Sequence, residues 1–365
     1  MQKKLCEISS PKQWKTISSD LLMVNGYPVY GANGIIGYYN EYNHERETLL
    51  ITCRGATCGS LNICQPYSYV NGNAMALDNL SDDVDIKYLY YYLLNRGLSD
   101  VITGSAQPQI VRQSLESVIV EYPALNKQKE IVSNLNRIEE LISFRILQLS
   151  KLDELVKSRF IELFGMPGAD DFGWGLAPLG NICCINPKKG QDPRLSNGVE
   201  VSFVPMPAVT ERGEINATAV KKYDEVKTGF TYFAENDVLF AKITPCMENG
   251  KGAVARGLHN GLGFGSTEFH VLRPISGKSN PYWIYTLTAF SQFREDAASN
   301  MTGSAGQRRV PASFLENYRV AVPPIELQEQ FATFVEQTDK SKLVIRQSLE
   351  KLETLKKSLM QKYFG

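Results

Sequence analysis

Residues whose types and spacing could support catalysis are scarce in this chain of 365 residues. Gly277-Lys278-Ser279 resembles the end of a phosphate-binding loop, but Leu272 stands where such a loop needs its first glycine. Asn186-Pro187-Lys188 lacks the second proline and the aromatic residue of an amino-methyltransferase motif. The three histidines are scattered, and the seven cysteines do not have zinc-ligand spacing, which favours reduced free thiols. The pattern predicts no catalytic residues and no metal site.

One polar motif does recur. Thr103-Gly104-Ser105-Ala106 reappears as Thr302-Gly303-Ser304-Ala305, and a Gln-rich or Arg-rich stretch follows each copy. Amide and guanidinium groups donate hydrogen bonds to base edges and phosphates, so polar and basic residues in and near these stretches are candidate nucleic-acid ligands. Any one of them is more commonly a solvated surface charge. The candidates beside the motif are Gln107, Gln109, Arg112, Gln307, Arg308 and Arg309, and the basic residues Arg54, Lys242 and Lys251 are added from elsewhere in the two regions.

The segments that must position these residues form an internal repeat. Residues 123–165 align without a gap to residues 323–365, and ten of the 43 positions are identical. Each copy closes on Phe-Gly, at Phe164-Gly165 and Phe364-Gly365. The regions before them, 1–122 and 166–322, differ from each other. The chain is therefore predicted to be two unlike domains, each followed by a related segment.

The repeated segments have the pattern of long helices. Alternating spacings of four and three pick out ten positions from Ile131 to Leu163 and ten from Phe331 to Tyr363. Eight of the first ten and seven of the second ten are apolar or aromatic, which is typical of a coiled coil. We predict an antiparallel pair of helices related by a pseudo-two-fold axis, each about 58 Å long. The alternative is two helices that pack separately on their own domains. Residues predicted to pack along the pair or against a partner are Leu149, Leu152, Leu155, Leu349, Leu352 and Leu355.

The two unlike regions carry Gly-rich turns and short β-branched runs, which indicate mixed α/β (α+β) domains. Helices are expected at 84–98 and 281–297, the first with a Tyr-rich face that belongs to the core. Basic and acidic residues number 39 each, so a polybasic protein is excluded, and no apolar run is long enough for a membrane span. Binding to nucleic acid would then require basic residues gathered on one face.

This arrangement resembles the specificity subunit of type I restriction–modification systems. The residues that carry the resemblance are 103–110, 122–131 and 157–165 in the first half and 322–330 and 357–365 in the second. The segment Tyr27–Tyr38, followed by Cys53-Arg54-Gly55, is also similar to one type of the family's target-recognition domain. Each motif alone is only moderately specific for this family. The order of the motifs and their duplication are highly specific for it.

The resemblance implies a non-catalytic subunit that recognises a bipartite site in double-stranded DNA. Target-recognition domains would occupy 1–122 and 166–322, and spacer helices 123–165 and 323–365. The helices would dock two modification (methyltransferase) subunits, and a restriction subunit would provide translocation and cleavage. No cofactor is expected in this chain, since S-adenosylmethionine, ATP and Mg²⁺ would be bound by the partner subunits. The expected location is the cytoplasm, with no membrane contact.

Two other functions are compatible with the residues alone. A coiled-coil adaptor that binds only proteins would share the helices, and it would retain no DNA selectively. A nuclease with an unrecognised site would cleave DNA in a metal-dependent assay of the purified chain.

Overall fold

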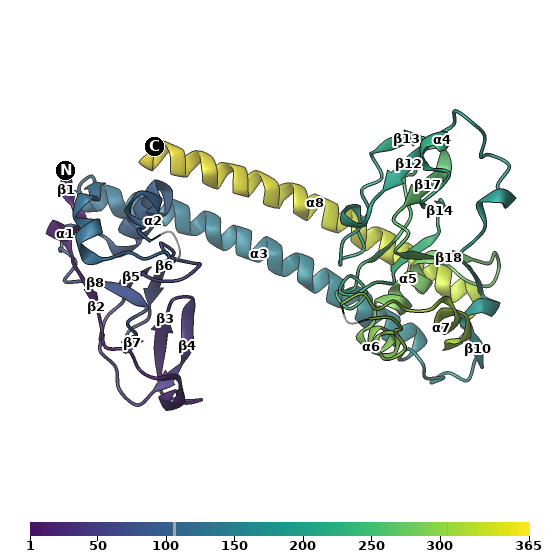
Figure 1. Cartoon of the computed structure of the whole chain (residues 1–365), viewed down its shortest axis with the longest axis horizontal. Helices are drawn as coiled ribbons and strands as arrows, with labels where there is room; N and C mark the ends of the chain where they lie inside the picture. Colours follow the sequence, from purple (N-terminus) through teal and green to yellow (C-terminus); the bar gives the residue numbers. More distant parts are fainter. Residues whose placement is uncertain (105–106, 305) are drawn as a thin grey trace. The chain divides into compact units, whose positions relative to one another are not determined.

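The computed structural model describes residues 1–104, 107–304 and 306–365. The chain divides into two compact units, which we call the first unit (Met1–Leu147 with Arg346–Gly365) and the second unit (Gln148–Ile345). Two 40-residue helices, α3 (Leu125–Phe164) and α8 (Ile325–Phe364), each contribute one end to each unit (Figure 1). These bounds match the two repeated segments closely.

The rest of the first unit consists of short strands and helices. The strands are β1 (Gln2–Lys4), β2 (Ser10–Gln13), β3 (Tyr27–Gly31), β4 (Gly34–Tyr39), β5 (Thr48–Thr52), β6 (Leu61–Cys64), β7 (Tyr69–Val70), β8 (Ala74–Asp78) and β9 (Ile119–Glu121). The helices are α1 (Leu5–Ile8) and α2 (Ile86–Arg96), with 3-10 turns η1 (Ser19–Leu21), η2 (Ser99–Val101) and η3 (Arg112–Ser117).

The second unit is built from a similar set. Its strands are β10 (Leu176–Pro178), β11 (Cys183–Ile185), β12 (Glu200–Val204), β13 (Val220–Lys222), β14 (Thr231–Ala234), β15 (Val238–Ala241), β16 (Gly252–Val254), β17 (Leu262–Gly265), β18 (Phe269–Pro274) and β19 (Arg319–Ala321). Its helices are α4 (Tyr223–Val226), α5 (Pro281–Ala289), α6 (Ser291–Ser299) and α7 (Ala312–Asn317), with 3-10 turns η4 (Leu179–Asn181), η5 (Lys189–Gln191), η6 (Met206–Ala208) and η7 (His259–Gly261).

The two units share one sheet topology despite their different sequences. The order β2-β8-β5-β6 in the first unit corresponds to β11-β18-β15-β16 in the second, and all pairs in both are antiparallel. A second sheet, β4-β3-β7, corresponds to β13-β12-β17, with one antiparallel and one parallel pair in each; β14 extends only the second unit's sheet. The predicted α/β fold class with two long helices is confirmed.

Alternation along the central strands explains why each sheet is covered on both faces. In β5, Leu49 and Ile51 join the core beneath α2 and α3, whereas Leu50 faces the neighbouring sheet. In β15, Phe240 lies in the core with α5, whereas Leu239 packs against the other sheet. Strands buried on both faces are apolar throughout, as these short runs are.

The helical seam predicted from the heptad spacing is confirmed. All twenty seam positions, ten in each helix, are buried or half-buried. In the first unit Leu135 of α3 shares a core with Met360 of α8, and in the second Phe160 contacts Phe331. The start of each helix thus packs near the end of the other within its unit, which is the antiparallel arrangement. The seam residues Lys356 and Lys342 join the helices through ion pairs with Glu139 (2.7 Å) and Asp153 (2.8 Å).

A fully buried glutamine attaches α3 to the first unit. The Oε1 atom of Gln128 accepts the backbone N–H of Asp85 at 2.8 Å, and its Nε2 donates to the carbonyls of Asp83 and Pro123 at 2.8 and 2.9 Å. Asp85 also caps α2, because its side chain accepts two backbone N–H groups of the first turn. One amide therefore couples the start of the long helix to the start of α2.

The second unit repeats this attachment with Gln328. Its Oε1 accepts the N–H of Asn280, the cap of α5, at 2.9 Å, and its Nε2 donates to the carbonyls of Lys278 and Pro323 at 3.1 and 2.9 Å. Gln128 and Gln328 are equivalent in the repeat, so the identity at this position reflects the same three hydrogen bonds.

Two sequence expectations about helices are tested by the fold. The helix expected at 84–98 is α2, and Tyr88 and Tyr91 are buried in the core as predicted. The helical stretch expected at 281–297 is present as two helices, α5 and α6, which are separated at Phe290 because this residue adopts an extended backbone and packs on Phe160. Burial of the Phe290 ring outweighs continuation of the helix, which periodicity alone did not reveal.

Candidate nucleic-acid interface

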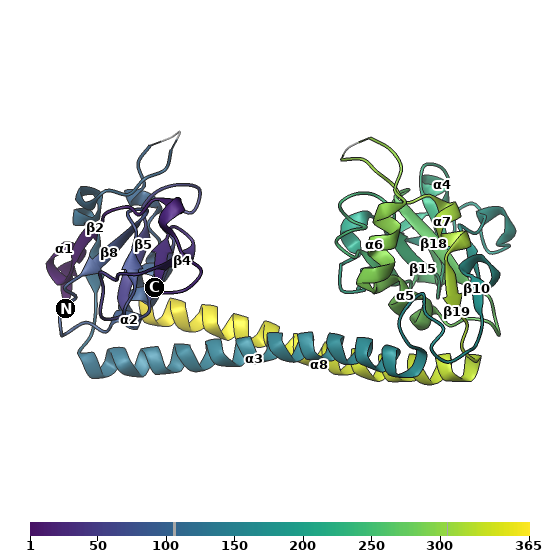
Figure 2. The same ribbon diagram turned by 90° about the horizontal axis from the view of Figure 1, so that it is seen from below.

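Loops that carry the predicted ligands meet at one end of the first unit. The loop after β5 bonds to the loop at 103–109 through the N–H of Gly55 and the carbonyl of Pro108 at 3.3 Å. The N–H of Cys53 donates to the carbonyl of Asn73, just before β8, at 3.1 Å. In Figure 2 this loop cluster lies on the side of the first unit opposite α3. Ser105 and Ala106, in the recurring motif, lie outside the described residues.

The second unit repeats the loop cluster bond for bond. Thr244 N–H donates to the carbonyl of Arg308 at 3.1 Å, as Gly55 does to Pro108, and Lys242 N–H donates to the carbonyl of Glu268 at 2.9 Å. This cluster also lies opposite the long helices of its unit (Figure 2). Ala305 is the motif residue outside the described part here.

Glycine is required at the same point of both loops. Gly104 has φ +84°, and a Cβ added there would lie 2.5 Å from the carbonyl oxygen of Gln107. Gly303 has φ +116°, and its Cβ would lie 3.0 Å from the carbonyl oxygen of Gln307. The left-handed backbone and the close carbonyl explain why the glycine of the recurring motif is retained.

The predicted ligands of the first unit are exposed. Arg54, Gln107 and Gln109 belong to the loop cluster, where Gln109 forms isolated bridges with both Arg54 and Thr103. Arg112 is also exposed, but it is the first residue of η3, which contacts α1. Its charge lowers the pKa of the Cys6 thiol, against the larger raising effect of burial. Of the four ligands predicted in the first unit, the loop cluster therefore brings three together.

The predicted basic ligands of the second unit face carboxylates. Arg309 forms a bidentate pair with Glu268, which holds the pKa of that carboxyl below its ordinary value. Arg308 lies 3.8 Å from Glu248, and Lys251 lies 3.7 Å from Glu211.

Lys242 and Gln307 complete this set. Lys242 is half-buried, and burial lowers its pKa. Gln307 is exposed. The sequence did not predict the carboxylate partners of Lys251, Arg308 and Arg309. These carboxylates come from other loops, and no sequence motif joins them to the basic residues.

The predicted packing leucines divide into two groups. Leu149 is buried, and Leu152, Leu349 and Leu352 are half-buried. Leu155 and Leu355 are each 47% exposed, so the helix pair does not bury them, and their packing against a partner stays a prediction. Val156 and Lys356, one residue on, take the seam, and successive residues point about 100° apart around a helix. Leu155 and Leu355 are available only to a partner.

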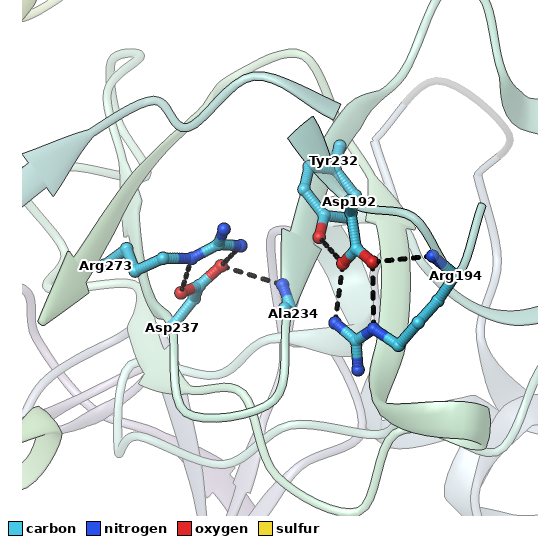
Figure 3. Close-up of polar contacts among 6 residues, drawn as sticks. All are labelled: Asp192, Arg194, Tyr232, Ala234, Asp237 and Arg273. Carbon is cyan, nitrogen blue, oxygen red and sulfur yellow. Dashed lines mark hydrogen bonds and ion pairs between the residues drawn. The ribbon is translucent and has the colours of Figure 1, made fainter. Parts of the chain in front are cut away.

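A charged cluster that the sequence did not predict lies in the second unit (Figure 3). Arg273 donates two hydrogen bonds to buried Asp237, at 2.8 and 2.7 Å, and the N–H of Ala234 adds a third at 2.7 Å. Burial pushes the pKa of Asp237 upward against the lowering by Arg273; with three N–H donors, we regard the carboxylate as ionised.

The second half of this cluster fixes a loop. Asp192 accepts hydrogen bonds from Arg194 and from the hydroxyl of Tyr232, which hold its pKa far below its ordinary value. The Arg273 guanidinium lies 5.4 Å from the Tyr232 ring centre. Perturbed pKa values can mark an active site, but here each perturbed charge has its counter-charge within the cluster, which is the arrangement of a structural network. Asp192-Pro193-Arg194, a turn-like tripeptide, was its only local signal.

Among the described residues, no group of three or more His, Cys, Asp or Glu side chains is placed to hold a metal ion. No described helix is long and apolar enough to cross a membrane.

Comparison with known proteins decides the family. Residues 2–153 and 173–354 match the family described as "Type I restriction modification DNA specificity domain". The chain belongs to this family. Over 153 residues, 42% of the chain, it is 44% identical to the Escherichia coli type I restriction enzyme EcoEI specificity subunit, and over 159 residues, 43% of the chain, 42% identical to the EcoAI specificity subunit. These matches span 25% and 26% of the relatives' own lengths, about a quarter.

Solved structures share the fold of this specificity-domain chain. The S subunit of a type I restriction–modification system from M. genitalium superposes with a TM-score of 0.61 at 15% identity, covering 100% of this chain and 96% of that one. A structure from a study of complex assembly and conformational transition in a type I R-M system gives 0.54 at 16% identity, covering 100% and 97%.

Proposed function

We propose that this chain is the DNA sequence-specificity subunit of a type I restriction–modification complex, acting in the cytoplasm. Its target-recognition domains, residues 1–122 and 166–322, would each read one half of a bipartite site in double-stranded DNA. The observation that carries the proposal is the duplicated loop cluster: one backbone framework, built twice, presents different polar side chains. Such a framework suits recognition of two different half-sites.

The long helices would dock two modification subunits. Each unit has large apolar side chains exposed on its helical segments, among them Phe144 at 61% in the first unit and Val344 at 66% in the second. Phe144 and Val344 are equivalent in the repeat, as are Leu155 and Leu355. Two similar apolar faces favour two copies of one partner.

The chemistry would belong to those partners. In the proposed complex, modification subunits bind S-adenosylmethionine and methylate adenine, while a restriction subunit uses ATP and Mg²⁺. This chain would select the sequence without catalysis. Because its net charge is zero, we expect the chain alone to bind DNA weakly and the complex to bind with a steep salt dependence. Tight, salt-insensitive binding by the chain alone would contradict this.

Sequencing of modified bases in a host with and without the gene tests the proposal. One bipartite modified motif should disappear when the gene is deleted and return with a plasmid copy. In a second step, residues 166–322 are replaced by the corresponding domain of another subunit, which should change one half-site only. An unaltered set of modified motifs after deletion would refute the proposed function and favour the protein-only adaptor.

A further inference from the structure

Two residues occupy the same backbone position in the two loop clusters. Gln109 exchanges backbone hydrogen bonds with Thr103, both 2.8 Å, and Arg309 does so with Thr302 at 2.8 and 3.0 Å. The next residues, Ile110 and Val310, donate to the carbonyls of Cys53 and Lys242 at 3.0 and 2.9 Å. The backbone framework thus makes Gln109 and Arg309 counterparts.

A second pair of counterparts lies beside them. Asn73 and Glu268 precede the equivalent strands β8 and β18, and their carbonyls accept from Cys53 and Lys242. In the second unit this places a carboxylate against Arg309. In the first unit the same two positions carry the uncharged amides of Asn73 and Gln109, both exposed.

The guanidinium of Arg309 is held on one side and open on the other. Its Nε and Nη2 atoms donate to the two carboxylate oxygens of Glu268 at 2.9 and 2.8 Å, and Nη1 donates to the carbonyl of Gln307 at 3.0 Å. A guanidinium has five N–H donors, so among the described contacts one N–H on each Nη nitrogen remains. The side chain is 41% exposed, so these two donors can meet a ligand from outside.

The remaining donors suit a base better than a phosphate. Guanine presents O6 and N7 side by side in the major groove, which matches two parallel N–H groups. Phosphate attraction depends on net positive charge, and the Glu268 carboxylate offsets the charge of Arg309. A side chain held in one orientation also loses less freedom on binding, which strengthens a directional contact.

We propose that Arg309 recognises a guanine in the second half-site, that Glu268 is the positioning residue for this contact, and that Gln109 recognises an adenine at the equivalent place of the first half-site. Adenine presents N7 and N6–H₂, an acceptor and a donor that a glutamine amide can pair with together. This inference rests on the proposed function of the chain.

The test exchanges these side chains between the two frameworks in the complete complex. Arg309→Gln with Glu268→Asn installs the first unit's residues in the second, and Gln109→Arg with Asn73→Glu does the reverse. The modified motif of each strain is determined by base-modification sequencing. The first variant should convert one guanine of the second half-site to adenine, and the reverse variant one adenine of the first half-site to guanine. Each preference should shift about tenfold to a hundredfold at one position only.

Two further variants separate the roles of charge and position. Arg309→Lys keeps the charge without the paired donors, so it should lose guanine selectivity at that position while the rest of the motif remains. Glu268→Gln should weaken that selectivity, with a smaller effect than Arg309→Lys. Arg319→Gln, on β19 near the start of α8, is the matched control and should leave the motif unchanged.

The outcomes are distinguishable. If the motif is unchanged in Arg309→Gln/Glu268→Asn, or if it changes in the first half-site, the inference is wrong. Loss of all modification in both Arg309→Gln/Glu268→Asn and Arg309→Lys would also overturn it, since Arg309 would then support folding or general DNA binding. If the unaltered chain supports no modified motif, the proposed function itself fails.

Discussion

The two units of this protein have equivalent frameworks and different loop chemistry. The first has Cys53, Asn73 and Gln109 where the second has Lys242, Glu268 and Arg309, on the same backbone hydrogen bonds. The glutamines that attach the long helices, by contrast, are identical and make identical bonds. A few buried amides and glycines thus specify the framework of each unit, which leaves the loop side chains free to vary.

The difference extends into the sheets. Asp78 of β8 and Arg273 of β18 occupy equivalent strand positions with opposite charges, as the strand registers show. Asp78 accepts from His44 and Trp14, whereas Arg273 pairs with Asp237. In each unit the charged side chain at this strand position is therefore paired with a residue from a different loop.

The largest difference in stability between the two units is expected from Asp237→Ala. Loss of the carboxylate leaves the Arg273 guanidinium without its counter-charge, which should destabilise the second unit by about 3–5 kcal/mol. Hydrogen exchange of peptides from both units measures the change. The first unit should be unaffected, and Glu329→Ala, which removes an exposed carboxylate from α8, should have little effect. Equal loosening of both units would contradict the structural role of the cluster.

Gln128→Leu and Gln328→Leu should each destabilise their own unit by about 3 kcal/mol. Each removes three hydrogen bonds and leaves a part-buried N–H and two carbonyls without this partner. Urea unfolding followed by hydrogen exchange in each unit gives the two values. Gln347→Leu, at an exposed position of α8, is the control. A difference of more than about 2 kcal/mol between the two variants would break the equivalence of the attachments.

A pH effect on stability is expected from His270 in the second unit. His270 occupies the strand position that Met75 holds in the first unit, and burial lowers its pKa. Its Nε2 donates to the carbonyl of Val310 at 2.8 Å, and its Nδ1 accepts from Asn186 at 3.0 Å. The unfolded chain therefore takes up a proton more readily, and stability is lost as pH falls from about 6.5 through the lower pKa of the folded state.

Unfolding of the full chain between pH 8 and pH 5 checks this, with His270→Met as the comparison. The variant is expected to be less stable overall, because the Val310 carbonyl loses its donor, but its stability should fall less steeply over this range. A slope identical to that of the unaltered chain would assign the pH dependence to other groups.

The smallest effect concerns neighbouring thiols of β11. Burial raises the pKa of Cys183 to about 12, whereas Cys184 is exposed. A thiol reagent at pH 8 should modify Cys184 quickly and Cys183 only on unfolding, because the thiolate is the reacting species. Mass spectrometry of peptides from the labelled chain measures both rates. Similar rates would show that this edge of the sheet opens readily.

Much of the architecture could be predicted from the sequence. Heptad spacing is a local property, so the two helices and their seam followed from residue periodicity, and duplication made the antiparallel pair the simplest arrangement. The break at Phe290 could not be predicted, because it depends on which neighbours compete for a buried position.

The candidate site divides in the same way. The recurring Thr-Gly-Ser-Ala motif identified two equivalent loops, and Gln and Arg beside it identified hydrogen-bonding side chains. It did not identify Glu268 as the partner of Arg309, since 41 residues separate them and they meet through the pairing of β15 with β18 and the bonding of the Arg309 loop to the residues after β15.

The duplication, the long helices and the scarcity of catalytic motifs can be predicted from the sequence, because they depend on residue types at fixed spacing. Which polar residues share a loop cluster, and which arginines and lysines pair with carboxylates, becomes evident in the folded chain. Those properties depend on contacts between distant segments, and their energies come from burial and from hydrogen-bond geometry, neither of which has a period in the sequence.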